Sequence, residues 1–255
     1  MMPVPAPSLW SPPPQPLGLA SDEVHVWRAR LDVMAAQVEA LAQILAADER
    51  ARAQRFWAAR DRAHYIVARG LLRAILGRYL DEQPERLRFC YNPHGKPALA
   101  EEQAADALRF NVSHAHGMAL YAITRGREIG VDLERIRADL MGEDIAARFF
   151  APREVAMLQA LPVHRRHEAF LTLWTRKEAY VKARGDGLSL DLTRFDVSRA
   201  VVEPAARVTS DAERHDLRRW SLRDLAPGPD YVAALAVEGH GWQLKCWQWP
   251  VPTDG

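Results

Sequence analysis

The sequence predicts an α+β protein with two similar halves that meet near residue 127. Two observations support this fold class. Segments with helical periodicity are followed by strand-like segments, and the same order of helices and then strands recurs in the second part of the chain. The chain has 255 residues, 48% of them hydrophobic, which is enough apolar material for one large domain or two small ones. No repeat is visible in residue identity, so the similarity concerns the order of the elements.

The first part of the chain combines a proline-rich tail with two helices. Residues 1–20 hold seven prolines, and proline removes backbone donors, so we expect an extended tail outside any helix or central strand. The first half then covers residues 21–127. Apolar residues at helical spacing predict helices over residues 33–45 and 60–80. The basic segment between them, residues 49–57, suits either a solvated helical face or a ligand-binding surface.

Strand-like segments complete the first half and open the second. Residues 87–91 alternate in the manner of a strand, and residues 92–97 have the composition of a turn. Three further strand-like segments follow in quick succession and are separated by short turns, which predicts an antiparallel meander. They cover residues 110–114, 118–124 and 129–134.

The second half, residues 128–249, repeats this order. Helices resume near Gly142, and Pro152 suits a first helical turn. A long helix is predicted over residues 164–182, with Gly185 beyond its end as a glycine cap requires. Strand-like segments then cover residues 195–197, 220–222, 231–237 and 242–249, and residues 250–255 form a C-terminal tail.

Charge and cysteine content exclude several functional classes. The 34 Lys and Arg residues nearly cancel 33 Asp and Glu residues, and the net charge of +1 argues against bulk nucleic acid as the main partner. Two cysteines, Cys90 and Cys246, are too few for a disulfide framework. No apolar run is long enough to span a membrane, and the N-terminus lacks the features of a secretory signal. We therefore expect a soluble cytoplasmic protein.

Three carboxylates are candidate metal ligands. Asp132 and Glu134 are two residues apart on a predicted strand, so both side chains emerge on one face and repel each other. A hard divalent cation such as Mg²⁺ would offset this repulsion. Glu178 shares a helix face with Trp174, and a carboxylate on a buried helix face needs a partner that a metal would supply. The alternatives are exposed acids at a strand end and a surface pair between Glu178 and Lys182.

Groups suited to phosphate binding occur at several places in the chain. They are Arg52, Lys96, Ser113, His114 and Lys182. Ser113 and His114 are adjacent on a strand and point to opposite faces, so they cannot form a nucleophile pair. His116, two residues after His114, suggests a pair of zinc ligands, but neither a cysteine nor a third histidine is suitably spaced to complete a zinc site. The sequence also lacks a nucleophile elbow, a P-loop and a dinucleotide-binding fingerprint.

Five motifs resemble those of the 4′-phosphopantetheinyl transferases of the larger, surfactin-synthetase-activating type, in order and approximate spacing. They are Gly95–Pro97, Phe110–His114, Gly130–Glu134, Trp174–Lys182 and Gly185–Leu190. The resemblance implies two α+β halves related by pseudo-twofold symmetry, with antiparallel sheets packed against helices and coenzyme A in the cleft between them. Smaller relatives form this cleft between subunits, so a chain of this length is expected to act as a monomer.

The resemblance also implies a reaction and a site. Coenzyme A would donate its 4′-phosphopantetheine arm to a serine of an apo acyl or peptidyl carrier protein, leaving adenosine 3′,5′-bisphosphate. Mg²⁺, or Mn²⁺ as an alternative, would be held by Asp132, Glu134 and Glu178. Glu178 is also the candidate general base, and Lys182 and Asp132 complete the catalytic set. The contacts to coenzyme A would come from Arg52, Lys96, Ser113, His114 and Lys182.

One position departs from the family and one surface is a candidate for carrier docking. Family members often carry a basic residue three before the position of Arg52, where this chain has Glu49. Carrier proteins present an acidic helix beside their serine, so a basic surface near the long helix is a plausible docking site. The candidates are Arg148, Arg153, Arg165, Arg166, Arg176 and Arg184, with Phe149, Phe150 and Met157 as apolar contacts.

Two other functions fit part of the pattern. A non-catalytic module that binds coenzyme A or a nucleotide would need Arg52 and Lys96 but not three acids together. A different Mg²⁺-dependent phosphotransferase would need the acids but use another donor. The intact set of Asp132, Glu134 and Glu178 therefore favours an enzyme.

Overall fold

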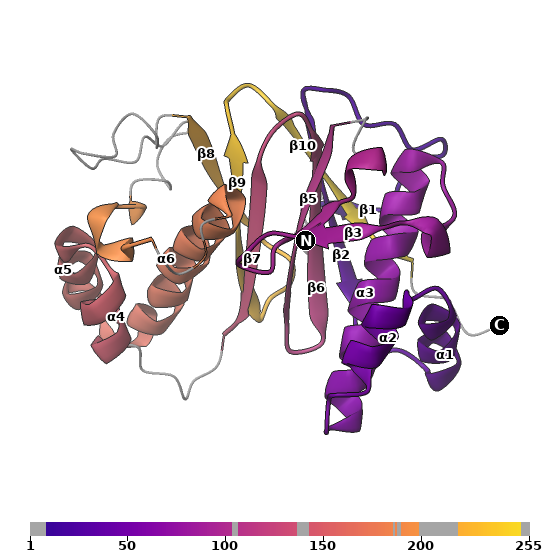
Figure 1. Ribbon diagram of the computed structural model, residues 1–255. Coiled ribbons are helices and arrows are strands. Elements are labelled where there is room, and N and C mark those ends of the chain that lie inside the picture. Colours follow the sequence, from indigo (N-terminus) through magenta and orange to yellow (C-terminus); the bar gives the residue numbers. More distant parts are fainter. Residues whose placement is uncertain are drawn as a thin grey trace, which may run out of the picture.

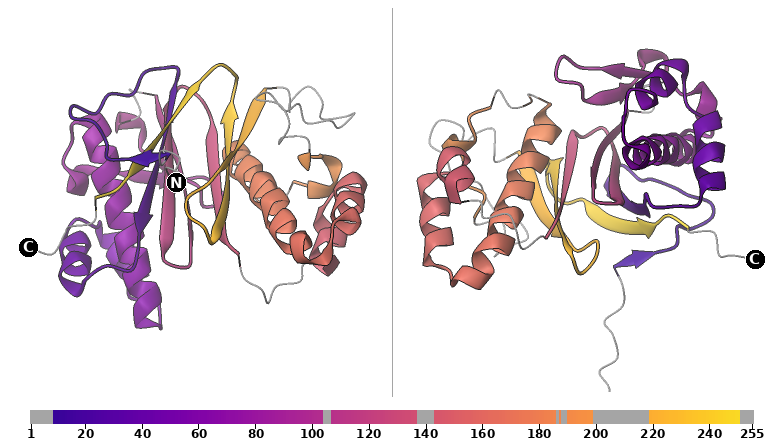
Figure 2. Two further views of the ribbon diagram at one scale, coloured as in Figure 1. Left: turned by 180° about the vertical axis from the view of Figure 1, so that it is seen from behind. Right: turned by 90° about the horizontal axis from the view of Figure 1, so that it is seen from below.

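The computed structural model describes residues 9–103, 107–136, 143–185, 187, 190–198 and 219–250. The two halves lie side by side, each with a long helix packed against a sheet (Figure 1). Seen from below, the helices of the two halves lie on opposite outer sides and the strands lie between them (Figure 2). Residues 1–8 and 251–255 of the predicted tails, Gly142 and part of the Gly185–Leu190 motif lie outside the described residues.

The first half is built on a five-stranded sheet with the order β1-β10-β2-β6-β5. The strands are β1 (Trp10–Ser11), β2 (Glu23–Arg30), β5 (Leu108–Ala115), β6 (Met118–Arg125) and β10 (Gln243–Gln248). The helices are α1 (Ala35–Gln43), α2 (Ala47–Ala53) and α3 (Ala59–Leu80). A separate hairpin joins β3 (Phe89–Tyr91) to β4 (Pro97–Leu99), and short 3₁₀ helices cover Pro84–Arg86 and Glu101–Gln103.

The second half is built on a three-stranded antiparallel sheet with the order β7-β9-β8. Its strands are β7 (Ile129–Arg135), β8 (Trp220–Leu225) and β9 (Tyr231–Glu238). Its helices are α4 (Glu143–Phe149), α5 (Pro152–Ala160) and α6 (Val163–Arg184), with a 3₁₀ helix at Leu192–Arg194. As predicted, Pro152 stands in the first turn of α5, and Gly185 ends α6 with a φ of 79°.

The two halves repeat one arrangement, which confirms the predicted fold class. Each runs from a strand through helices to a long helix and then to two antiparallel strands. The strand order β2-β6-β5 in the first half corresponds to β7-β9-β8 in the second. The long helices α3 and α6 have 22 residues each. No helix in the described part of the chain is long and apolar enough to cross a membrane.

Three sequence predictions differ from the structure. Strand β7 does not continue the meander of β5 and β6 but pairs with β9, so the predicted three-stranded meander is wrong. Strand β10 pairs in parallel with β2, so the end of the range 128–249 lies in the sheet of the first half. Residues 195–197 form no strand, because the carbonyls of Phe195 and Val197 accept hydrogen bonds from Lys177 and Arg176 of α6.

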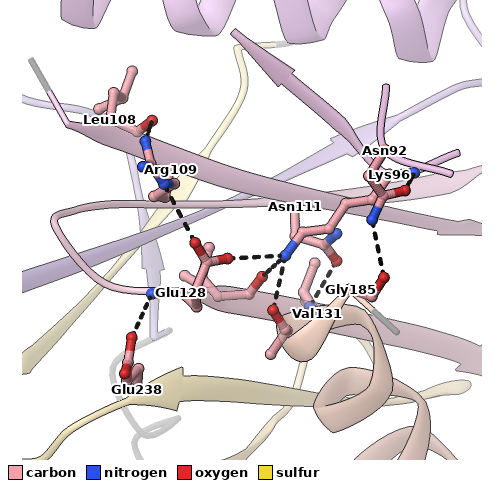
Figure 3. A network of polar contacts seen from close by, with 11 residues as sticks. Asn92, Lys96, Leu108, Arg109, Asn111, Glu128, Val131, Gly185 and Glu238 are labelled. Atoms are coloured by element: carbon pink, nitrogen blue, oxygen red, sulfur yellow. Dashed lines mark hydrogen bonds and ion pairs between the residues drawn. The ribbon is translucent and has the colours of Figure 1, made fainter. Parts of the chain in front are cut away.

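The halves meet where the edge strands β5 and β7 lie against each other. The Asn111 side chain of β5 accepts a hydrogen bond from the backbone N–H of Val131 in β7 at 2.9 Å, which bridges the two sheets (Figure 3). An apolar cluster between the sheets includes Val26, Leu120 and Leu235. Helix α6 approaches β7 closely, since a Cβ on Gly130 would stand 2.1 Å from the carbonyl oxygen of Ala179. This contact requires glycine and brings α6 to the seam between the halves.

Candidate active site

A cavity of about 640 Å³ lies along β5, β7 and α6. Six of the sequence-predicted site residues line it, and they come from segments far apart in the chain. They are Ser113, His114, Asp132, Glu134, Glu178 and Lys182. The structure therefore brings together the three acids and most of the predicted phosphate-binding groups.

Asp132 is at the centre of the polar contacts in this cavity. Its side chain is buried, and its Oδ1 accepts hydrogen bonds from Lys182 Nζ at 2.6 Å and from Ser113 Oγ at 3.0 Å. Lys182 Nζ also donates to Ser113 Oγ at 3.1 Å. Asp132 Oδ2 is buried and has no hydrogen-bond partner among the described residues. Such an atom has lost its water without gaining a donor, so it is suited to bind a cation.

Helical periodicity directs Glu178 and Lys182 into the cavity. Trp174, Glu178 and Lys182 are spaced by four residues on α6, so their side chains share one face of the helix. Trp174 packs against Phe149, Phe150 and Phe170, which holds this part of α6 in position. The neighbouring Arg176 and Lys177 point away from the cavity and are buried in the second half. One helix thus carries both a face that lines the cavity and a face that packs in the core.

Burial and neighbouring carboxylates raise the pKa values of Glu134 and Glu178. Desolvation, followed by repulsion from Asp132, raises the pKa of Glu134 to about 6. The same two causes, in the same order, raise the pKa of Glu178, and Lys182 partly offsets them. Burial and the Lys182 ammonium lower the pKa of His114. The cavity therefore holds more negative charge than Lys182 compensates, which is the electrostatic setting of a cation site.

The carboxylates fit a hard divalent cation by their chemistry. Carboxylate oxygens are the ligands that Mg²⁺ takes from proteins, and Asp132 Oδ2 is free to coordinate. Among the described residues, however, no three acidic, histidine or cysteine side chains already stand close enough together to hold one ion. A shared ion would therefore require Glu134 or Glu178 to move relative to Asp132.

Arg52 and Lys96 lie outside the lining of this cavity. Arg52 is exposed on α2, with its guanidinium 5.6 Å from the ring centre of Tyr65. Lys96 lies at the seam instead, where its Nζ donates to the carbonyl of Ala183 at 2.9 Å and lies 3.3 Å from both the Ile129 carbonyl and a Glu128 carboxylate oxygen (Figure 3).

The turn that carries Lys96 is fastened to the end of α6. Asn92 Nδ2 donates to the carbonyl of Gly185 at 2.9 Å (Figure 3). Asn92 Oδ1 accepts hydrogen bonds from the backbone N–H groups of His94 and Lys96. Glu128 also lies 3.4 Å from Arg109 Nε, so Lys96 and Arg109 share one carboxylate. This network connects the β3–β4 hairpin to α6 and β7.

Glu49 has a structural role that explains why it is acidic. It is buried and accepts hydrogen bonds from Arg69 and Arg73 of α3 and from the backbone N–H of Ala46. These contacts fasten α2, which carries Arg52, to α3. A lysine or arginine here would place a third positive charge beside Arg69 and Arg73.

The predicted docking surface is partly wrong. Arg176 is 1% exposed, and its Nε and Nη2 donate to the two carboxylate oxygens of Asp224. Phe150 is buried, and Phe149 and Met157 pack against the same apolar core. Arg148 and Phe149 line the cavity itself, where Asp191 also contributes although it was not among the predicted site residues. A signal for Asp191 exists in the sequence, because it directly follows the Gly185–Leu190 motif.

Comparisons with known proteins show which family this chain resembles. A family model described as "4'-phosphopantetheinyl transferase superfamily" matches residues 128–236, and one for the N-terminal part of 4′-phosphopantetheinyl transferases matches residues 29–125. The 4′-phosphopantetheinyl transferase HetI of Nostoc sp. is 43% identical over 240 residues, covering 94% of this chain and 98% of HetI. Sfp of Bacillus subtilis is 28% identical over 159 residues, covering 62% of this chain and 68% of Sfp. The solved structure of a Chronobacterium ammoniagenes ACPS–CoA complex matches with a TM-score of 0.34 and 20% identity, covering 47% of this chain and 99% of that one.

The family models and the HetI match define a group-transfer enzyme rather than a binding module. The chain belongs to the 4′-phosphopantetheinyl transferase superfamily. The resemblance to the larger type, inferred from five short motifs, is thereby confirmed. The two family models meet between residues 125 and 128, next to the predicted junction at residue 127.

Proposed function

We propose that this transferase moves the 4′-phosphopantetheine arm of coenzyme A to a serine of an apo carrier protein in a Mg²⁺-dependent reaction that releases adenosine 3′,5′-bisphosphate. The observation that carries the proposal is the buried Asp132, whose Oδ2 has no hydrogen-bond partner among the described residues while Lys182 and Ser113 bind its Oδ1. Asp132, Glu134 and Glu178 would hold the ion, and the ion would neutralise the pyrophosphate. Mn²⁺ has the same preference for oxygen ligands and is the alternative.

The residues of the chain have separate roles in this proposal. Ser113, His114 and Lys182 would bind phosphate oxygens of coenzyme A, and the Lys182 ammonium would stabilise the negative charge on the leaving group. Glu178 would accept the proton of the carrier serine, because its carboxylate faces the cavity and is half-buried. Arg52 lies outside the cavity, so its contact would be to a part of the ligand that extends over the first half. Both halves belong to one chain, which supports activity as a monomer.

Mass spectrometry of a carrier protein tests the proposed reaction. Incubation of an apo carrier with the protein, coenzyme A and Mg²⁺ is expected to add about 340 Da, the mass of the phosphopantetheine group from its covalent formula. A carrier with its serine changed to alanine is the matched control and should gain nothing. A wild-type carrier that keeps its mass would contradict the proposal, and a product that forms equally well in excess chelator would contradict the metal dependence.

Lys96 provides a second prediction, because its contacts suggest a role different from the one its sequence motif implies. Its ammonium holds the last turn of α6 and the start of β7, which carry Lys182 and Asp132. We therefore expect Lys96→Met to lower kcat about tenfold, equivalent to about 1.4 kcal/mol, with KM for coenzyme A changed less than about threefold. Steady-state kinetics with a saturating carrier would measure both constants.

A matched control separates this role from a general effect on the hairpin region. Arg88→Met removes a cation whose side chain is 75% exposed beside Glu102, so we expect little change in either constant. If Lys96→Met raises KM for coenzyme A while kcat stays at the wild-type value, Lys96 contacts the ligand directly, as the sequence resemblance implies.

A further inference from the structure

A second cavity, of about 570 Å³, lies at the ends of the strands and is lined by four arginines from both halves. The first half supplies Arg28 and Arg30 from the end of β2 and Arg60 from the start of α3, and the second half supplies Arg135 from the end of β7. Among the described residues of the lining, the acidic ones are Asp32 and Asp230, so the four arginines and these two acids together carry a formal charge of +2. The whole chain carries only +1, so positive charge is concentrated here.

Two of these arginines are available to a partner. Arg30 and Arg135 are exposed at the ends of their strands, and among the described residues neither guanidinium forms a hydrogen bond or an ion pair. Arg60 is paired with Asp32, but its side chain is 70% exposed. Exposed guanidinium groups bind carboxylates with two parallel hydrogen bonds, which makes arginine the common residue for recognising acidic groups.

The walls of this cavity are fixed by contacts between distant segments. The Arg28 guanidinium donates to Gln248 Oε1 at 2.6 Å and to the carbonyl of Pro227. The hydroxyl of Tyr231 donates to the carbonyl of His116 at 2.8 Å, which joins the β8–β9 loop to the β5–β6 turn. Gly117 in that turn has a φ of 84°, and a Cβ there would stand 2.3 Å from Asp32 Oδ2. The arginines are therefore held on a preformed surface.

Residues that line the second cavity are close neighbours in the sequence of residues that line the candidate active site. Arg135 follows Glu134, and His116 is two residues beyond His114. Successive side chains of a strand point to opposite faces, so Glu134 lines the active-site cavity while Arg135 lines the second one. A partner bound at Arg135 would thus be close to the acids without occupying the space that coenzyme A is proposed to fill.

We propose that this arginine cavity binds the acidic side chains beside the serine of the carrier protein. The inference rests on the proposed function, and it is an alternative to the docking surface predicted near α6, where Arg176 is buried. Charge complementarity supports this proposal, because the acidic helix of a carrier protein would face unpaired arginines. These arginines come from both halves of the chain. Trp57, three residues before Arg60, is 99% exposed and would supply an apolar contact at the rim.

The test is a charge reversal of the two unpaired arginines. The double variant Arg30→Glu/Arg135→Glu is expected to raise KM for the carrier about tenfold or more, while KM for coenzyme A and kcat stay within about twofold of wild type. The matched control is Arg86→Glu/Arg88→Glu, which reverses two exposed arginines of the first half and should change none of the three constants. Equal thermal midpoints would show that both variants are folded.

Different kinetic results would assign the arginines a different role. A rise in KM for coenzyme A instead of KM for the carrier would show that the arginines bind a phosphate of the donor, and it would overturn the proposal. No change in either constant would do the same. If Arg153→Glu/Arg165→Glu alone raises KM for the carrier, the exposed arginines of α5 and α6 form the docking surface. A carrier in which lysines replace the acids beside its serine provides the reciprocal change. If the arginines contact those acids directly, the double variant should have a low KM for this altered carrier.

This experiment also separates the inference from the proposed function. If wild-type protein adds no phosphopantetheine to any carrier, the proposed function fails and the docking surface has no reaction to serve. If the wild-type protein is active and the double variant has an unchanged KM for the carrier, only the docking inference fails.

Discussion

Glu178→Gln is expected to reduce turnover by at least about a thousandfold. The substitution keeps the size of the side chain but removes its negative charge and most of its basicity. In the proposed reaction Glu178 both holds the ion and accepts the proton of the carrier serine, so one substitution removes two contributions to the transition state. The rate of transfer to an apo carrier at saturating coenzyme A would measure the effect.

Glu168→Gln provides the control for this variant. Glu168 is an exposed acid on the same helix, ten residues earlier and outside the lining of the cavity. It should retain wild-type kinetics, and both variants should bind coenzyme A in calorimetry through Ser113, His114 and Lys182. Unchanged kcat in Glu178→Gln would remove Glu178 from the mechanism.

The predicted site residues that line the active-site cavity share a simple periodic basis. Asp132 and Glu134 are two residues apart on a strand, and Glu178 and Lys182 are four apart on a helix, so local geometry fixes which side chains point the same way. Spacing alone did not show that this strand and this helix lie next to each other. That expectation came from the family resemblance. In the structure, Gly130 allows α6 to lie directly on β7, and this contact joins the two pairs.

Prediction from the sequence failed where an element depends on partners distant in the chain. Strand β2 was not predicted at all, yet it is a central strand between β6 and β10. It contains His25, a polar residue that is fully buried because Tyr79 and Glu23 satisfy its ring nitrogens. The same limit applies to Lys96, since only the folded chain brings its ammonium to the carbonyl of Ala183. In both cases, hydrogen bonds between segments distant in the chain fix a structure that the local amino-acid composition does not indicate.

Arg176 was also misplaced for a physical reason. A basic residue in a motif beside a catalytic acid suggests a binding group, because buried arginines are rare. Here Asp224 of β8 and the carbonyl of Val197 bind the guanidinium in the interior. The partners lie 48 and 21 residues away along the chain, so no local pattern announces them.

Lys177→Met is the substitution with the largest expected effect on stability, about 3–5 kcal/mol. Lys177 and Glu154 are both fully buried, with Nζ and Oε2 2.8 Å apart, and Nζ also donates to the carbonyls of Leu192 and Phe195. Methionine fills a similar volume but leaves the Glu154 carboxylate without its counter-charge. Urea unfolding would measure the change in the free energy of unfolding. Lys245→Met is the control, because it removes a lysine that is 41% exposed and paired with Glu23. We expect it to lower the free energy of unfolding by less than about 1 kcal/mol.

The cost of Lys177→Met should also depend on pH, because it arises from a buried charge. Burial already raises the pKa of Glu154 in the presence of Lys177, and without the lysine the folded protein should hold the proton still more strongly. A carboxyl whose pKa is raised by folding favours the folded state when protonated, and this contribution is lost as the pH rises through the folded-state pKa. The deficit should therefore be largest near neutral pH and shrink toward the ordinary carboxyl value of 4.5. Adding Glu154→Gln to Lys177→Met should recover part of the stability at neutral pH. A loss of stability that is equal at neutral pH and near pH 4.5 would show that lost packing, and not the unpaired carboxylate, is responsible.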